Sequence, residues 1–326
     1  MFAMGTGTVN ISIVDIWRAI MGLFFSDSSS FSSSSQIHTI LFDIRLPRIL
    51  LALCLGAILA ISGAVMQGLF RNPLADPSLI GVSGGASVGA SIVIVMAGGW
   101  IQSGSALGLS AVAAGAFAGG FIATILVYRL ATSEIGTSVT TMLLAGIAIG
   151  AIAGAVNSLL SYFADNDMLR QISLWQMGNL STANWSRVAM VAAVAVVLVG
   201  LFPRDSRALN ALLLGESEAR HLGIDVQRVK RRLIVLTALG IGTSVAMAGM
   251  IGFVGLVVPH AIRLLIGPDH RWLLPGSALA GATLLIIADS LARVVVAPTE
   301  LPTGILTALL GAPFFIALLI QRRREI

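Results

Sequence analysis

The sequence has little charge. Only 11% of its 326 residues are charged, whereas soluble globular domains carry about 25%. Its mean hydropathy is +0.94. A chain of this length with so few charges and long apolar runs does not fit a soluble globular protein. The composition instead predicts a protein of the lipid bilayer.

Cysteine and lysine are almost absent. Cys54 is the only cysteine, so no intramolecular disulfide can form, and its apolar neighbours favour a small buried side chain over redox chemistry. Lys230 is the only lysine, and it lies in QRVKRRL without the glycine-rich approach of a phosphate-binding loop. The chain therefore lacks this route to ATP hydrolysis.

Catalytic and metal-binding patterns are also missing. The four histidines are scattered and show neither an HExxH pattern nor paired-ligand spacing. His260 follows Pro259 and is expected to cap or orient a helix end, with ligand contact as the alternative. We expect no enzymatic activity, no metal and no cofactor. The high pI reflects arginines outside the spans and does not suggest nucleic-acid binding.

Nine apolar runs are present. A helix needs about 20 apolar residues to cross a hydrocarbon core of ~30 Å. The runs cover residues 47–70, 77–98, 105–130, 138–162, 188–203, 232–252, 253–267, 272–295 and 303–321. They predict an all-α, polytopic transmembrane helical bundle of about nine to ten spans, with residues 1–326 forming a single domain.

The arginines at the ends of these runs indicate an orientation. One side collects Arg71, Arg129, the cluster at 204–232, Arg263, Arg271 and Arg322 to Arg324; the other holds Arg45, Arg48, Arg170, Arg187 and Arg293. By the positive-inside rule the first side is cytoplasmic, and so is the C-terminus. The serine-rich segment 26–36 is then a flexible periplasmic loop.

The cytoplasmic segment 204–231 is too polar to span. Within it, Leu209, Leu212 and Leu213, and then Ala219 and Leu222, recur at helical spacing. Gly215 separates the two sets and predicts two short amphipathic helices. Apolar faces outside the membrane favour a protein partner over the alternative of a solvated loop.

Small residues recur at four-residue spacing, which places each set on one helix face. The sets are Gly81, Gly85 and Gly89; Gly115 and Gly119; and Gly146, Gly150 and Gly154. Such faces let membrane helices pack closely, and a substrate path is the alternative for the first and last sets.

Few charges lie within the spans. Asp289 and Arg293 are four residues apart near the outer end of one run, which indicates a local pair. A proton relay would need acidic groups in several spans. The outer loop between two spans contains Trp175 and Trp185 and predicts a short interfacial helix.

Four long segments carry a resemblance to a known family. They are IRLPRILLALCLGAILAISGAVMQGLFRNPLADPSLIGVSGGASVGA (44–90), LLLGESEARHLGI (212–224), GFVGLVVPHAIRLLIGPDHRWLLPGSALAGATLLIIADSLAR (252–293) and ELPTGILTALLGAPFFIALL (300–319). They closely resemble FecCD-type permeases, the membrane subunits of type II ABC importers for vitamin B12, ferric siderophores and haem. The likeness covers the chain from about residue 8.

The resemblance implies an assembly and a function. It implies a homodimer with the substrate path on the dimer axis, two cytoplasmic ATP-binding subunits and a periplasmic binding protein. The expected function is import of an iron chelate, haem first, across the bacterial inner membrane. An ion-driven secondary transporter and a purely structural membrane protein are the alternatives.

The resemblance also assigns roles to residues. The ATPase-coupling residues would be Leu213, Gly215, Glu216, Ser217 and Arg220. The docking residues for the binding protein would be Arg45, Arg48 and Arg293, expected to be exposed, with snorkelling to the membrane interface as the alternative. The substrate path and gate would include Ser138, Thr140, Thr141 and Arg170.

One departure from the family pattern concerns the start of the chain. In the family an apolar span precedes the segment similar to residues 7–24, and only MFAMGTG stands there here. We expect either nine spans, with a periplasmic N-terminus, or a truncated start.

Overall fold

The computed structural model describes residues 2–5, 12, 14, 15, 17, 36–97, 106–133 and 136–323. Each predicted apolar run corresponds to one helix, so the all-α prediction is confirmed. In chain order these helices are α4 (Leu46–Leu69), α5 (Val82–Ala97), α6 (Ala106–Ala131), α7 (Val139–Phe163), α9 (Trp185–Leu201), α12 (Val226–Ala248), α13 (Val254–Ile266), α14 (His270–Ala292) and α15 (Thr303–Arg323).

The helices differ in length. Within the described residues, six are long and apolar enough to cross a membrane: Gln36–Leu69, Leu107–Ala131, Val139–Phe163, Trp185–Leu214, Val226–Ala248 and His270–Ala292. The apolar helices Val82–Met96, Val254–Ile266 and Thr303–Ala317 are shorter. Helix α5 begins at Val82, five residues after the start of the apolar run at 77–98. Pro77–Ile80 form the 3-10 helix η2 instead, and Gly81, with φ +82°, then turns the chain.

Several short elements connect these helices. They are α1 (Phe2–Gly5), the π-helix η1 (Thr39–Arg45), the strands β1 (Thr132–Ser133) and β2 (Gly136–Thr137), α8 (Asn166–Gln176), η3 (Phe202–Asp205), α10 (Ser206–Leu214) and α11 (Glu216–His221). The predicted interfacial helix is α8, and α10 and α11 are the two predicted amphipathic helices on either side of Gly215. The predicted serine-rich loop at 26–36 lies outside the described residues except for its last residue.

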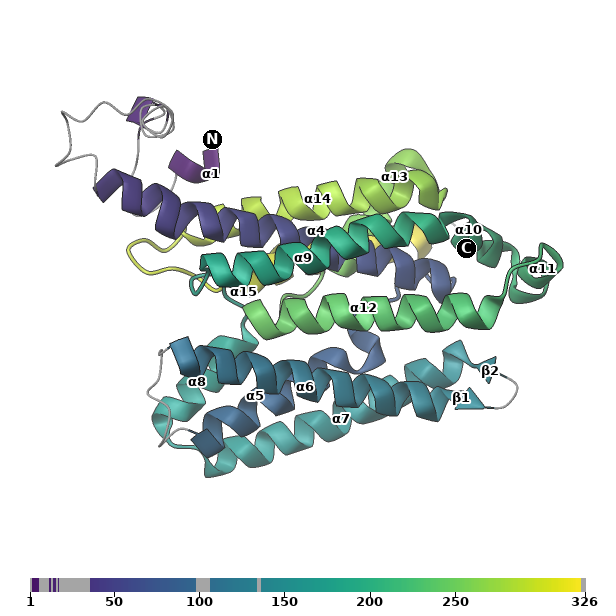
Figure 1. Ribbon diagram of the computed structural model, residues 1–326, viewed down its shortest axis with the longest axis horizontal. Helices are drawn as coiled ribbons and strands as arrows, with labels where there is room; N and C mark the ends of the chain where they lie inside the picture. The colour runs from purple at the N-terminus through teal and green to yellow at the C-terminus, as the bar shows by residue number, and fades with distance from the viewer. Residues whose placement is uncertain are drawn as a thin grey trace.

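The helices form two groups with α12 between them (Figure 1). The first contains α5, α6, α7 and α8, and the second contains α4, α9, α13 and α14. Glycines bring the backbones together: a Cβ at Gly56 would lie 2.2 Å from the backbone oxygen of Gly281, and one at Gly89 would lie 2.0 Å from that of Gly115. The packing role predicted for the glycines of α5 and α6 is therefore confirmed.

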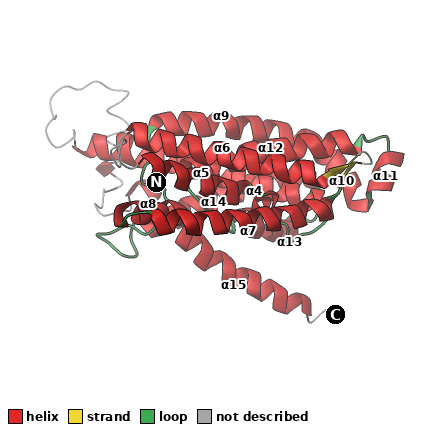
Figure 2. Cartoon of the chain, turned by 90° about the horizontal axis from the view of Figure 1, so that it is seen from below, coloured by secondary structure: helices red, strands yellow, loops and turns green. Residues whose placement is uncertain are grey.

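The glycines of α7 behave differently. A Cβ at Gly150 or Gly154 would meet nothing within 4 Å among the described residues, so the packing predicted for these two is wrong within the chain, whereas Gly146 of the same set is buried. Leu144, Ile147 and Ile152 on α7 are also exposed. One face of α7 is thus uncovered, and α15 diverges from the bundle (Figure 2).

The two ends of the bundle carry different elements. Helices α10 and α11 and the β1–β2 hairpin lie at one end, and α1, α8 and the start of α4 lie at the other (Figure 1). Arg129, in the last turn of α6, precedes the hairpin, whereas Arg45, the N-cap of α4, lies at the opposite end. The C-terminal end of α15 lies at the same end of the bundle as α10 and α11 (Figure 1). The two groups of arginines that the sequence analysis assigns to opposite sides therefore lie at opposite ends of the bundle.

Candidate functional sites

The first candidate site is a platform formed by residues 206–222, which comprise α10, Gly215 and α11. Gly215 has φ +134°, a conformation that favours glycine, and so permits the sharp break between the helices. Leu209, Leu212 and Ala219 are buried against the bundle. On the other face Leu213, Leu214 and Leu222 are 40%, 70% and 64% exposed. The platform therefore has one apolar face that packs inward and another that nothing in the described chain covers.

Polar contacts fasten α10 to the neighbouring helices. Asn210 Nδ2 donates to Asp269 Oδ1 at 2.6 Å, and Asn210 Oδ1 accepts from the backbone N–H of His270 at 2.9 Å. Hydrogen bonds from the backbone N–H of Arg271 and the amide of Asn210 lower the pKa of Asp269. Asp205, just before α10, pairs with Arg232 of α12. These contacts hold α10 against the bundle.

The predicted coupling residues divide into two kinds. Leu213, Ser217 and Arg220 are exposed, as contact with a partner requires. Glu216 instead turns its carboxylate inward: Lys230 Nζ lies 2.6 Å from Glu216 Oε1. Its pair with Arg220, at 3.9 Å and largely exposed, adds little stability.

The polar segment 204–231 is mostly helical. Residues 226–231 belong to the first turns of α12, whose N-cap Asp225 accepts a hydrogen bond from Arg228 N–H. The charges gather here because α10, α11 and the first turns of α12 lie between the apolar runs at 188–203 and 232–252. The segment is therefore helical, as the spacing of its apolar residues predicts.

The predicted gate residues lie at the start of α7. Ser138 Oγ caps the helix and accepts from Thr141 N–H at 3.3 Å, and the two hydroxyl oxygens lie 3.0 Å apart. Ser138, Thr140 and Thr141 are exposed. Arg170, also exposed, is on α8 beyond the other end of α7. The structure thus places Arg170 away from the three hydroxyl groups.

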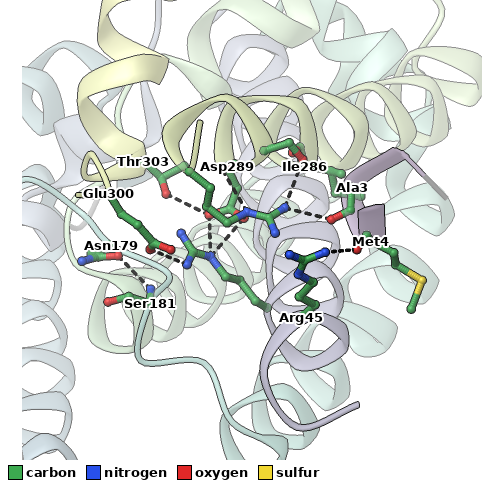
Figure 3. Close-up of polar contacts among 12 residues, drawn as sticks. Ala3, Met4, Arg45, Asn179, Ser181, Ile286, Asp289, Glu300 and Thr303 are labelled. Atoms are coloured by element: carbon green, nitrogen blue, oxygen red, sulfur yellow. Dashed lines mark hydrogen bonds and ion pairs between the residues drawn. The ribbon is translucent and has the colours of Figure 1, made fainter. Parts of the chain in front are cut away.

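The second candidate site is a buried arginine cluster at the opposite end (Figure 3). Arg48 Nε donates to Asp289 Oδ1 at 2.9 Å, and Arg48 Nη1 donates to Glu300 Oε2 at 2.6 Å. Arg293 Nε lies 3.3 Å from Asp289 Oδ2, and Thr303 Oγ1 donates to Asp289 Oδ1 at 3.3 Å. Asp289 therefore joins α4, α14 and the start of α15.

Residues of α1 cover part of this cluster. Arg293 Nη2 donates to the carbonyl oxygen of Ala3 at 3.1 Å, and Arg45 Nη1 donates to that of Met4 (Figure 3). Arg45, Arg48 and Arg293 are only 4–5% exposed. The expectation that these arginines are exposed is therefore wrong for the single chain, because carboxylates and carbonyl oxygens surround them.

The interpretation of Asp289 and Arg293 as a purely local pair is also too narrow. Arg48, 241 residues earlier in the chain, shares the same carboxylate. The basic motif IRLPR and the acidic position in ADSLAR are both visible in the sequence. Their contact depends on the crossing of α4 and α14, which no local pattern reveals.

A cavity of about 340 Å³ lies among α4, η2, α5, α12 and residues 250–256. Its lining is mostly apolar, with Asp76, Ser78 and Ser83 as polar members.

His260 is buried in the middle of α13, so the expectation that it caps a helix end is wrong. Among the described residues, no group of three or more His, Cys, Asp or Glu could hold a metal ion.

These features define a class of protein. A multi-pass helical bundle with an uncovered extramembrane platform is typical of a transport permease that works with partner proteins. The sequence model of the FecCD transport family matches residues 1–321. The chain therefore belongs to the FecCD transport family and is a permease of the ABC-transporter class.

Individual relatives agree with this assignment. The chain is 46% identical to the hemin transport system permease protein HmuU of Yersinia pestis, over 98% of this chain and 91% of that protein. It is 44% identical to the cobalamin import system permease protein BtuC of Halobacterium salinarum, over 95% and 80%. A solved metal-chelate type ABC transporter in an inward-facing conformation has a TM-score of 0.80 and 34% identity, over 95% and 97%.

Proposed function

We propose that the chain is the permease subunit of an ATP-driven importer that carries haem from the periplasm to the cytoplasm across a bacterial inner membrane. Two copies form a homodimer with the substrate path on its axis. Two ATP-binding subunits dock at the platform, and a periplasmic binding protein docks at the opposite end. Family membership and the named relatives support this assembly.

The observation that carries the proposal is the outer face of the platform. Leu213, Leu214 and Leu222 form an apolar surface beyond the spans, where exposure to water is unfavourable and a protein partner would cover them. The inner face of the same helices is packed and hydrogen-bonded to the bundle. A force applied to the outer face would therefore reach the spans.

The charge distribution supports a cytoplasmic platform. Arginines crowd at residues 204–232, at the ends of α4, α6 and α13, and at the end of the chain. Positive residues of this kind remain on the cytoplasmic side during insertion. This orientation places the C-terminus in the cytoplasm and the arginine cluster on the periplasmic side.

The binding-protein surface includes the arginine cluster in this proposal. Arg45, Arg48 and Arg293 would meet acidic residues of the partner, as in the family resemblance. Since Ala3 and Met4 now accept hydrogen bonds from two of them, docking through these groups would require α1 to move aside. The gate, in the same proposal, includes Ser138, Thr140 and Thr141, and Arg170 meets the carboxylates of an anionic ligand.

Haem is preferred over cobalamin on the basis of the HmuU relative. The two identities, 46% and 44%, are close, so substrate choice needs a direct measurement. The chain would be purified with its partner ATP-binding subunits, reconstituted in proteoliposomes and supplied with the binding protein. Uptake of haem, cobalamin and a ferric siderophore would be compared, each with ATP or with an ion gradient alone.

We expect the rate of ATP-dependent uptake to be higher for haem than for cobalamin or the ferric siderophore. Uptake of cobalamin or a siderophore instead would change the substrate but keep the mechanism. Uptake by the purified chain with an ion gradient and no ATP would contradict the proposal and favour a secondary transporter.

A further inference from the structure

Lys230 is a buried cation with two specific partners. Its side chain is 2% exposed, and a charge in such a place must be paired and hydrogen-bonded. The ammonium group lies 2.6 Å from Glu216 Oε1 and donates to the carbonyl oxygen of Thr137 at 3.0 Å. Arg228 and Arg232 on the same end of α12 are exposed. Lys230 is thus directed between α11 and the hairpin.

The hairpin receives a second contact from α12. Gln227 Oε1 accepts from the backbone N–H of Thr137 at 3.0 Å, so both backbone polar groups of Thr137 are bound by α12 side chains. Gln227 and Lys230 are three residues apart and share a helix face. Gly136, with φ +128°, makes room for this contact, since a Cβ there would lie 2.3 Å from Gln227 Nε2.

Thr137 immediately precedes Ser138, the N-cap of α7. Thr137 is buried and also pairs with Thr132 across the hairpin, with the two hydroxyl oxygens 3.0 Å apart. A displacement of Thr137 therefore changes the position of the first turn of α7, where the predicted gate residues lie.

We propose that Glu216, Lys230 and Gln227 form a link that transmits movement of the platform to the start of α7. Lys230 and Gln227 are positioning residues: they act on the gate through Thr137 and do not touch substrate. The inference rests on the proposed function, because it needs an ATP-binding partner that moves α11.

The geometry suits transmission. Charge-assisted hydrogen bonds are short and directional, and a partly buried pair such as Glu216–Lys230 is screened less by salt than an exposed one. Helix α7 packs mainly on α5 and α6, whereas the β2 strand at its start is tied to α12. The link thus adds polar contacts between the start of α7 and α12 to the apolar packing of the bundle.

The test uses the complete transporter in proteoliposomes, with ATP hydrolysis and substrate uptake measured on the same vesicles. Lys230→Met keeps the length of the apolar side chain but removes both polar contacts. ATP hydrolysis should continue, while uptake per ATP should fall about tenfold, within the usual range of coupling between sites. Arg228→Met is the matched control, because Arg228 lies on the same helix but pairs only at the surface with Asp225 at 3.3 Å. It should leave both rates unchanged.

A second measurement follows the gate itself. In a Cys54→Ala background, Thr140→Cys would be labelled by a membrane-impermeant maleimide with and without ATP. The labelling rate should change with ATP when Lys230 is present and should become independent of ATP with Lys230→Met. A purely structural role for Lys230 would lower assembly but would not remove the ATP response of the complexes that form.

The outcomes separate this inference from the proposed function. Unchanged uptake per ATP and unchanged ATP-dependent labelling in Lys230→Met would overturn the link alone. If Lys230→Met does not assemble, Gln227→Leu serves in its place, since it leaves the Glu216–Lys230 pair intact, and an unchanged ratio there would overturn the link as well. Absence of ATP-driven uptake in the unmodified complex would overturn both the proposed function and the inference that rests on it.

Discussion

Asp289 is the residue whose neutralisation should cost the arginine cluster most. Asp289→Asn keeps the shape of the side chain but removes the negative charge that Arg48 and Arg293 share at 2.9 Å and 3.3 Å. The two guanidinium groups would then retain Glu300 as the remaining carboxylate of the cluster. Because both arginines are buried, water cannot replace the lost partner.

The burial of Asp289 sets the expected loss in the free energy of unfolding. Removing one partner of a buried ion pair costs about 3–5 kcal/mol, because a charge is left uncompensated. The Asp289 side chain is 2% exposed, whereas that of Glu300 is 34% exposed. Glu300→Gln should therefore cost less than Asp289→Asn, because Glu300 is partly exposed and Arg48 keeps its hydrogen bonds to Asp289.

Denaturant titration of the detergent-purified chain would compare the free energies of unfolding of the two variants. The double variant Arg48→Met, Asp289→Asn completes the test, since it removes a charge of each sign. It should lose less stability than the sum of its single variants. Equal losses for Asp289→Asn and Glu300→Gln, or simple additivity in the double variant, would refute the assignment of a buried, shared carboxylate.

Three further changes test other parts of the structure. Gly56→Ala should destabilise the chain by about 1–3 kcal/mol, because the new Cβ would lie 2.2 Å from a backbone oxygen of α14; Gly150→Ala, in open space, should have no such effect in the same titration. Leu214→Glu combined with Leu222→Glu should reduce co-purification of the ATP-binding subunit, and undiminished recovery would argue against docking there. Glu216→Arg places a second cation beside the buried lysine and should uncouple uptake from ATP hydrolysis while the chain still folds, and normal coupling would contradict this.

Local sequence patterns predict the helices well. Apolar runs locate α4, α6, α7 and α14 because crossing a bilayer demands a length and a composition that are visible in a short window. Gly215 marks the break between α10 and α11 for a similarly local reason, since the backbone there adopts a positive φ. The tryptophans of the outer loop likewise predict the short helix that the structure shows as α8.

Contacts between distant segments are where prediction fails. The spacing of Gly150 and Gly154 matches that of the packed glycines of α5, yet their neighbours depend on which helix lies opposite. Likewise the burial of Arg48 depends on α14. A short stretch of sequence gives the residue types but does not determine which distant residues pack against them.

Helix α12 also makes specific contacts at the end of the bundle far from the platform. Its last turn accepts two hydrogen bonds. Asn179 N–H donates to Ala248 O at 2.7 Å, and Arg187 Nη1 donates to Met247 O at 3.1 Å. Asn179 follows α8, and Arg187 lies in the first turn of α9. The 23 residues of α12, at about 1.5 Å per residue, give a helix roughly 35 Å long that connects the two ends of the bundle. A displacement of α12 along its axis, produced at Lys230 by the platform, would therefore act on the start of α7 at one end and on Asn179 and the first turn of α9 at the other.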